Sequence, residues 1–426
     1  MEWLGDVPEH WDSCNLKFIS KIYAGGTPDR NRLDYWVKGE IPWINSGAVN
    51  QVIIKEPSEY ITELGLKNSS AKYIPVNSLV MALAGQGKTK GMVAYTSIET
   101  TCNQSMAAIV PKNYHYKFLY YWLDSNYQNI RNLTGGDNRD GLNLAVLSNI
   151  PCPKISIVEQ TQIVSFLNTE TTRIDNLITK QEKLIELLEE QRKSIISHAV
   201  TKGLNPNAPM KDSGVEWLGD VPEHWEVTRL KNIGKSIIGL TYSPNEICNP
   251  DDDSYLVLRS SNVQNGQLSF LDNVYVKSYV SEKLKIKKND ILICSRNGSR
   301  DLIGKNTIIK NPPKNSTFGA FMTVYRSEHA DYVYWILNSY IFKAQAGSYL
   351  TTTVNQLTIN NLNSMTVPFA PTSEQNEIVE FLSTENLKFN NLISKQKALI
   401  EKLKEYRASI ISHAVTGKID VMEFGA

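Results

Sequence analysis

The chain has 426 residues, of which 41% are hydrophobic and 21% are charged, and its formal net charge is +1 at pH 7. This length is too great for one typical core, so we expect at least two domains. The charge excludes a protein that holds nucleic acid through its own phosphate contacts alone, because such proteins are clearly basic. No apolar run reaches the ~18 residues of a membrane span and no signal segment opens the chain, so we expect a cytoplasmic protein without a membrane partner.

The first predicted element is a ten-residue motif, Glu-Trp-Leu-Gly-Asp-Val-Pro-Glu-His-Trp, which occupies residues 2–11 and returns unchanged at residues 216–225. A match of this length indicates a tandem duplication. Each copy consists of the motif, a globular body and a long helix. We place the first body and its motif at 1–157, the first helix at 158–203, a linker and the second body at 204–371, the second helix at 372–417 and a tail at 418–426.

The two bodies contain short β-branched runs bounded by Gly and Asn, with aromatic helical segments after them. Such runs, for example 79–83 and 291–294, are typical of strands. The predicted fold class is therefore mixed α+β: two globular α/β bodies in a pseudo-twofold tandem repeat, separated by two long antiparallel coiled-coil helices. The bodies are less alike than their flanks, which favours one shared role for the flanks and two different targets for the bodies.

The long helical stretches, residues 158–200 and 373–415, contain neither Gly nor Pro. Apolar side chains at alternating spacings of three and four predict a stripe that each helix buries against the other. We assign this seam to Ile174, Leu177, Leu184, Leu188, Ile195, Phe389, Leu392, Leu399, Leu403 and Ile410.

Several strings resemble catalytic motifs but lack their context. Residues 82–89 end in Gly-Lys-Thr like a phosphate-binding loop, yet they begin with Ala82 and lead into a predicted turn and strand instead of the required helix. Asn-Pro-Pro-Lys at 311–314 differs in its fourth residue from the Asn-Pro-Pro-aromatic corner of adenine methyltransferases. The five cysteines and six histidines show no ligand spacing. We predict no catalytic residue and no metal site.

Polar loops follow equivalent predicted strands in the two bodies, and they combine Gly with amide, hydroxyl and cationic side chains. Arg and Lys pair with guanine, Asn and Gln pair with adenine, and Ser and Thr bind phosphates. We therefore predict DNA binding by Asn45, Ser46, Gln86, Lys88, Thr89, Lys90, Arg259, Ser260, Arg296, Asn297, Ser299 and Arg300. A solvated turn explains any single one of them equally well, because these side chains dominate turns. Their occurrence at matching places in both copies favours DNA contact.

The doubled ten-residue motif resembles that of the specificity subunits of Type I restriction-modification systems. The segments that lead into the two long helices, Pro153 to Gln160 and Pro368 to Gln375, resemble that family too. So does the sequence Ser-Ile-Ile-Ser-His-Ala-Val, with which the two helices end at Val200 and Val415. The resemblance spans essentially the whole chain. It implies two target recognition domains, each reading one half of a split double-stranded DNA sequence, and helices that space them.

The same resemblance implies two methyltransferase subunits docked on the helices, with restriction subunits as further partners in some systems. S-adenosylmethionine, ATP and Mg²⁺ would then act in those partners, and this chain would be non-catalytic and without a cofactor of its own. Two alternatives stay open. One is a coiled-coil scaffold that binds proteins without reading DNA, and the other is a nucleotide-using enzyme that depends on Lys88.

Overall fold

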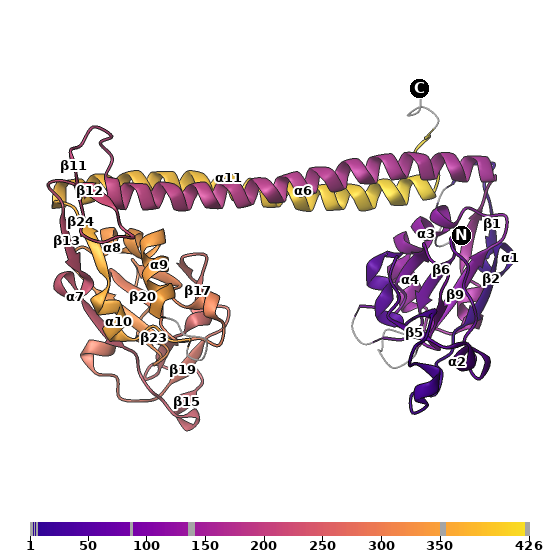
Figure 1. The fold of residues 1–426 in the computed structure, drawn as a ribbon, viewed down its shortest axis with the longest axis horizontal. Helices are drawn as coiled ribbons and strands as arrows, with labels where there is room; N and C mark the ends of the chain where they lie inside the picture. The colour runs from indigo at the N-terminus through magenta and orange to yellow at the C-terminus, as the bar shows by residue number, and fades with distance from the viewer. Residues whose placement is uncertain are drawn as a thin grey trace. The chain divides into compact units, whose positions relative to one another are not determined.

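The computed structural model describes residues 3 and 5 and residues 7–85, 88–134, 141–349 and 355–421. The chain forms two compact units, Met1–Gln181 with Ala398–Ala426, and Glu182–Lys397. The division cuts both long helices, α6 (Ile157–Lys202) and α11 (Thr372–Val415), so each unit holds one body and one part of each helix (Figure 1). Among the described residues, no helix is both long enough and apolar enough to span a bilayer.

The body of the first unit is built on an open sheet of order β2-β9-β6-β7-β4, in which neighbours are antiparallel except for the parallel pair β4 and β7. A smaller sheet of order β5-β3-β8 and the antiparallel pair of β1 and β10 complete it. The strands are β1 (Asp12–Asn15), β2 (Ser20–Ala24), β3 (Ile41–Ile44), β4 (Ile53–Ile54), β5 (Glu59–Ile61), β6 (Leu79–Ala82), β7 (Val93–Thr96), β8 (Thr101–Cys102), β9 (Met106–Pro111) and β10 (Pro151–Lys154).

The helices α1 (Leu16–Ile19), α3 (Tyr116–Ser125), α4 (Tyr127–Asn132) and α5 (Leu144–Ser148) share a core with one face of this open sheet. The 3-10 helix η2 (Ser46–Gln51) packs on the other face. The helix α2 (Glu63–Lys67) contacts the 3-10 helix η1 (Leu33–Tyr35) and packs against the smaller sheet. The aromatic segment of α3 buries Phe118 and Trp122 completely against Leu79 and Ile109 of the sheet. The same core continues under the helix pair, which is why the body and its helices form one unit.

The body of the second unit repeats this arrangement. Its open sheet has the order β14-β23-β20-β21, matching β2-β9-β6-β7, and its second sheet has the order β15-β19-β16-β22. Its strands are β11 (Met210–Asp212), β12 (Asp220–Pro222), β13 (Glu226–Arg229), β14 (Lys235–Ile238), β15 (Ile247–Cys248), β16 (Tyr255–Leu258), β17 (Val263–Gln264), β18 (Gln267–Leu268), β19 (Val274–Val276), β20 (Asp290–Cys294), β21 (Asn306–Ile309), β22 (Ser316–Phe318), β23 (Met322–Arg326) and β24 (Thr366–Phe369).

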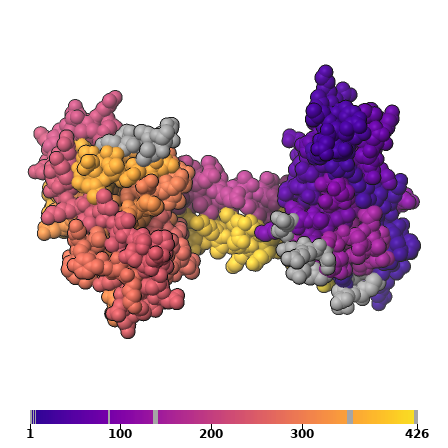
Figure 2. Space-filling view, turned by 90° about the horizontal axis from the view of Figure 1, so that it is seen from below, coloured from indigo at the N-terminus to yellow at the C-terminus, as the bar shows by residue number. Residues whose placement is uncertain are grey.

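Its helices are α7 (Leu230–Ile233), α8 (Ala330–Leu337), α9 (Tyr340–Tyr349) and α10 (Ile359–Ser364), with the 3-10 helices η3 (Pro244–Glu246), η4 (Ser260–Asn262), η5 (Glu282–Leu284) and η6 (Arg300–Leu302). As in the first copy, an aromatic helix after the open sheet, here α8, buries Tyr332 and Trp335. Figure 2 shows the surfaces of the two bodies, indigo to magenta for the first and pink to orange for the second. The repeat of strand order and helix position confirms the predicted mixed α+β class and the tandem duplication.

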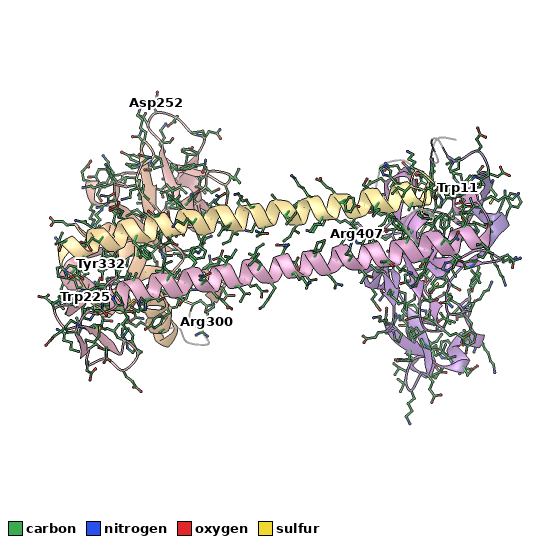
Figure 3. All side chains as sticks on the ribbon, turned by 90° about the horizontal axis from the view of Figure 1, so that it is seen from above. Trp11, Trp225, Asp252, Arg300, Tyr332 and Arg407 are labelled. Carbon is green, nitrogen blue, oxygen red and sulfur yellow. The ribbon has the colours of Figure 1, made fainter. Side chains whose placement is uncertain are left out.

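The two long helices run antiparallel within each unit, as predicted. In the first unit, Arg407 near the end of α11 points toward α6 and donates to Asp175, with 2.9 Å between Nε and Oδ1 (Figure 3). In the second unit, Arg192 near the end of α6 donates to Asn390 near the start of α11 at 3.0 Å. The end of one helix thus meets the start of the other in both units.

The buried stripe differs from the predicted seam at three of its ten positions. Ile174, Phe389 and Ile410 are buried, and Leu177, Leu188, Ile195 and Leu403 are partly buried. Leu184, Leu392 and Leu399 are 39%, 42% and 40% exposed, so their assignment to the seam was wrong. Ile393 and Ile400 are buried instead. The apolar residues at these places stand in adjacent pairs, and the second member of each pair, one residue later than we assigned, is the more buried one; Ile185 is partly buried.

The repeated ten-residue motif fastens each body to the start of its long helix. Trp11 is buried and its indole Nε1 donates to Glu159 Oε1 at 2.8 Å, in the first turn of α6. Trp225 makes the equivalent bond to Glu374 Oε2 in α11 at 2.9 Å. His10 and His224 contact the same two carboxylates. Both tryptophans therefore hold an acidic side chain at a helix N-terminus, where the macrodipole also favours it.

Candidate nucleic-acid interface

In the second unit, loops from the open sheet and from the second sheet line a cavity of about 1280 Å³. Three of these loops follow β14, β16 and β20, and a fourth lies directly before β23. Four of the predicted DNA-binding residues lie in its wall: Arg259, Ser260, Arg296 and Asn297. β16 belongs to the second sheet and β20 to the open sheet. The loops that follow these two strands are joined by the hydrogen bond from Asn297 Nδ2 to Ser260 Oγ, so all four residues face the same space.

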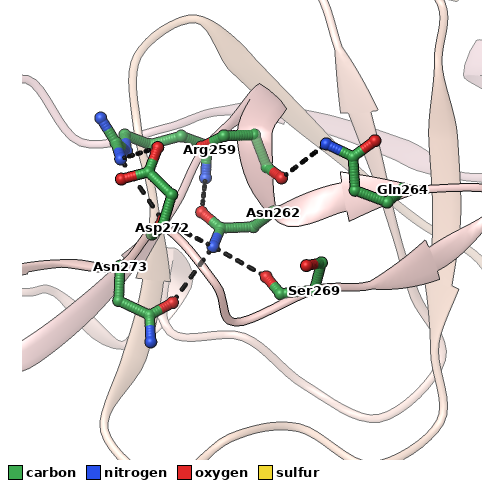
Figure 4. Close-up of polar contacts among 7 residues, drawn as sticks. Arg259, Asn262, Gln264, Ser269, Asp272 and Asn273 are labelled. Atoms are coloured by element: carbon green, nitrogen blue, oxygen red, sulfur yellow. Dashed lines mark hydrogen bonds and ion pairs between the residues drawn. The ribbon is translucent and has the colours of Figure 1, made fainter. Parts of the chain in front are cut away.

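Arg259 is tied down on the cavity wall. Its guanidinium forms an ion pair with Asp272, with 2.9 Å between Nη2 and Oδ2, and its backbone N–H donates to Asn262 Oδ1 at 2.9 Å (Figure 4). Its Nε is buried and has no hydrogen-bond partner among the described residues. The Asp272 carboxylate neutralises the charge of Arg259, so this arginine contributes shape and a directed N–H more than net positive charge.

Arg296 has different surroundings. It is exposed, and its guanidinium lies over the ring of Phe321, 5.1 Å from the ring centre. Its backbone is fixed, because its N–H donates to the Phe321 carbonyl at 3.0 Å and it forms a β-bridge with Gln356. Within the part of the chain that the structure describes, no acidic side chain forms an ion pair with Arg296. Arg296 therefore offers an uncompensated, planar cation with five N–H donors, and its backbone is held in place.

The remaining predicted residues of this loop organise the turn. Asn297 donates to Ser260 Oγ at 3.2 Å and accepts from the Ser299 N–H at 2.9 Å. These bonds join the loop after β20 to the loop after β16. Ser299 and Arg300 are exposed, and Arg300 Nη2 donates to the Gly347 carbonyl at 3.5 Å. Figure 3 labels the position of Arg300 in this body.

The first unit places its predicted residues in the equivalent loops. Asn45 is exposed, and its side chain accepts from the Gly47 N–H at 2.9 Å, which caps η2, while Ser46 is partly buried. Lys88 is exposed and Thr89 is partly buried, and the Lys88 carbonyl accepts from the Tyr127 hydroxyl at 2.5 Å. Lys90 is only 3% exposed, so its side chain does not face solvent. Gln86 lies outside the described residues.

The loop that contains Lys88 leads into a turn and then into strand β7, as the sequence predicted, and not into a helix. A phosphate-binding loop needs the N-terminus of a helix directly after its Lys-Thr pair. The local fold therefore gives no support to a nucleotide site at Lys88.

Sequence reasoning missed other residues in the cavity wall, notably Phe321, Tyr242, Asp272, Gln264 and Lys305. Phe321 is 59% exposed directly before a buried strand, where an aromatic residue usually packs inward. Asp272 is 13 residues from Arg259 and reaches it only because β16 pairs with β19. A sequence signal existed for Lys305, which closes the same polar loop as Arg296.

Residues 8–189 and 222–402 match the family model for the Type I restriction modification DNA specificity domain. The chain belongs to this family of specificity subunits. The two matches fall on the two copies, so each copy carries one specificity domain. Members of the family supply DNA target recognition to restriction-modification complexes and are non-catalytic parts of them.

Curated relatives agree with this assignment. The MjaVIII specificity subunit of Methanocaldococcus jannaschii is 25% identical over 433 residues, which cover 97% of this chain and 94% of that protein. The EcoR124I/EcoR124II specificity subunit of Escherichia coli is 31% identical over 179 residues, 41% of this chain. The chain spans 44% of the length of that subunit and of the Escherichia coli EcoKI subunit.

Solved structures show the same fold. A chain from work on complex assembly and conformational transition of the type I R-M system aligns with a TM-score of 0.75 at 16% identity, over 97% of this chain and all of that chain. The HsdS subunit from Thermoanaerobacter tengcongensis aligns with a TM-score of 0.56 at 15% identity, over 97% and 98% of the two chains.

Proposed function

We propose that each body of this specificity subunit reads one half of a bipartite double-stranded DNA target, through the polar loops that follow equivalent strands of its two sheets. The observation that carries the proposal is the duplication of these loops. Both copies place polar loops after equivalent strands, but with different side chains: Asn45 and Lys88 in the first, Arg259 and Arg296 in the second. Equal architecture with unequal side chains is what two different half-sites require.

The proposal assigns base contacts and phosphate contacts to different chains. Arg296 is the best-placed base reader, because an uncompensated guanidinium can pair with guanine through two hydrogen bonds. The net charge of +1 is too low for the subunit to hold the DNA backbone alone. Most phosphate contacts would therefore come from partners, and the isolated subunit would bind DNA weakly and in a strongly salt-dependent way.

The partners in this proposal are two methyltransferase subunits, docked on the long helices, with restriction subunits as additional members. Support comes from apolar side chains that the helix pair leaves in solvent. Leu187 is 50% exposed and Leu387 70% exposed, in addition to Leu392 and Leu399. Exposed apolar side chains on a helix suit a protein partner. S-adenosylmethionine, ATP and Mg²⁺ would act in these partners.

The test is selection from a random DNA library by the complex reconstituted with its own methyltransferase subunits, read by electrophoretic shift and sequencing. We expect one motif with two specified halves and an unspecified gap of fixed length. Retention of all sequences equally would support a protein scaffold without DNA readout and contradict the proposal. A single uninterrupted motif would contradict the assignment of one half-site to each body.

A further inference from the structure

The loop between β18 and β19, residues 269–273, carries the most exposed leucine of the described chain. Leu271 is 98% exposed, and its neighbour Phe270 is 49% exposed. An isolated exposed apolar residue on a mobile loop needs no explanation. This loop is different, because a buried side chain fixes the backbone on both sides of Leu271.

The buried side chain is that of Asn262, which is 0% exposed. Its Nδ2 donates to the Ser269 carbonyl at 2.9 Å and to the Asp272 carbonyl at 3.1 Å (Figure 4). The backbone carbonyl of Asn262 also accepts from the Ser269 N–H at 2.8 Å. The Arg259–Asp272 ion pair holds the loop from the other side. Buried polar networks of this kind fix one conformation. The exposed apolar tip is therefore held in place by the fold.

The tip lies beside the cavity, since Asp272 is part of the cavity wall with Arg259 and Arg296. The first copy differs at this point. Its equivalent connection, residues 55–58 before β5, has the sequence Lys-Glu-Pro-Ser and presents charges instead of an apolar tip. If the two bodies read different half-sites, this loop is one of the places where their readout differs.

We propose that Leu271 contacts the C5-methyl group of a thymine in the half-site read by the second body. The inference rests on the proposed function and deepens it. In the major groove, the thymine methyl is the apolar group that base pairs offer, whereas all other readout positions are hydrogen-bond donors or acceptors. A rigid apolar tip next to a cavity whose wall carries the uncompensated Arg296 matches a thymine in the same half-site as a guanine contact.

The test replaces each thymine of the selected target by deoxyuridine, which removes only the methyl group, and measures binding by the reconstituted complex. At one position we expect affinity to fall about fourfold, as for the loss of one buried methyl-sized group. The variant Leu271→Ala should bind the thymine duplex less tightly and should not distinguish thymine from uracil there. Its thermal unfolding should be unchanged, because the side chain is exposed.

The matched control is Tyr279→Ala. Tyr279 is 88% exposed. It lies after the C-terminal end of β19, whereas residues 269–273 lie before the N-terminal end of that strand. This variant should keep the thymine preference of the wild type. The inference is overturned if no thymine-to-uracil change affects the wild type. The inference is also overturned if Leu271→Ala still prefers thymine to uracil at that position. This holds as well if the variant keeps that preference and only assembles less well with the methyltransferase. Failure of the wild type to select any motif would instead refute the proposed function itself.

Discussion

At the scale of residues, Arg259 and Arg296 show how two similar side chains take different roles on one cavity wall. From the sequence, both were predicted to bind DNA, because each follows a predicted strand that has a counterpart in the first body and each has Ser or Asn beside it. The sequence could not show that Asp272 neutralises one of them, since that contact depends on strand pairing. We expect the free guanidinium of Arg296 to carry base recognition and Arg259 to shape the cavity.

Arg296→Ala should cost about 1–3 kcal/mol of DNA binding and relax base preference at one position of one half-site. Binding of the reconstituted complex to the selected target and its single-base variants measures this. The control is Lys288→Ala, which removes an exposed charge just before β20, whereas Arg296 follows the other end of that strand. An equal loss on every sequence would make Arg296 a phosphate contact.

His115 gives a prediction about pH. Burial lowers the pKa of His115, and the nearby charge of Lys117 lowers it further, so the folded state favours the neutral ring. The ring Nδ1 accepts from the Lys117 N–H at 3.2 Å and caps α3. A lowered folded-state pKa gives stability that is present above the ordinary histidine pKa of about 6.5 and is lost as pH falls from there through the lowered pKa of the folded state.

We therefore expect the melting temperature of the wild type to fall more between pH 7.5 and 5.5 than that of His115→Asn, which keeps a capping acceptor but does not titrate in this range. The other histidines are common to both proteins, so the difference isolates His115. Parallel pH profiles of the two proteins would contradict this account of the cap.

At the scale of elements, the sequence was sufficient to predict the long helices but not their buried face. A stretch without Gly or Pro and with repeated apolar spacing indicates an antiparallel pair, and α6 and α11 form one within each unit. Adjacent apolar residues such as Leu392 and Ile393 leave the buried member undecided, because either choice gives spacings of three and four. The facing side chains of the partner helix decide it.

The neighbouring residues Leu392 and Ile393 form a matched pair for mutation. Ile393 is 6% exposed and Leu392 is 42% exposed. Ile393→Ala should lower the free energy of unfolding by about 2–4 kcal/mol, since it leaves a cavity in the seam, and Leu392→Ala should lower it by less than about 1 kcal/mol. Denaturant unfolding of the two variants measures this. Equal losses would show that both side chains are buried in solution.

Some features of the site were beyond sequence reasoning for a similar reason. The polar loops could be recognised by composition, but the burial of Lys90 depends on the packing around β6 and β7. The role of the repeated motif was also hidden, because Trp11 and Glu159 are 148 residues apart in the sequence. Contacts between distant segments decide which polar residues face a ligand and which support the fold.

At the scale of the whole molecule, we propose that the length of the helix pair sets the gap between the half-sites. The seam repeats every seven residues, so an insertion of seven keeps the buried face, whereas an insertion of four moves the later apolar side chains off it. Inserting one heptad after Glu182 and one after Lys397 adds about 10 Å of helix. This corresponds to about three base pairs at ~3.4 Å each.

The selected motif of this insertion variant should contain both half-sites unchanged and a gap about three base pairs longer. The control is a variant in which residues 183–189 and 398–404 are replaced by other helix-forming heptads that keep the seam residues, without a change in length. An unchanged gap in the insertion variant would refute the role of the helices in spacing and leave them as a docking surface.

The central claim is that each body reads its own half of one target, and a comparison of two variants tests it most directly. Library selection by the reconstituted complex would be performed with the wild type, with Lys88→Ala in the first body and with Arg296→Ala in the second. We expect Lys88→Ala to relax base preference in one half of the wild-type motif only, and Arg296→Ala to relax it in the other half only. Relaxation of the same half by both variants would contradict the account.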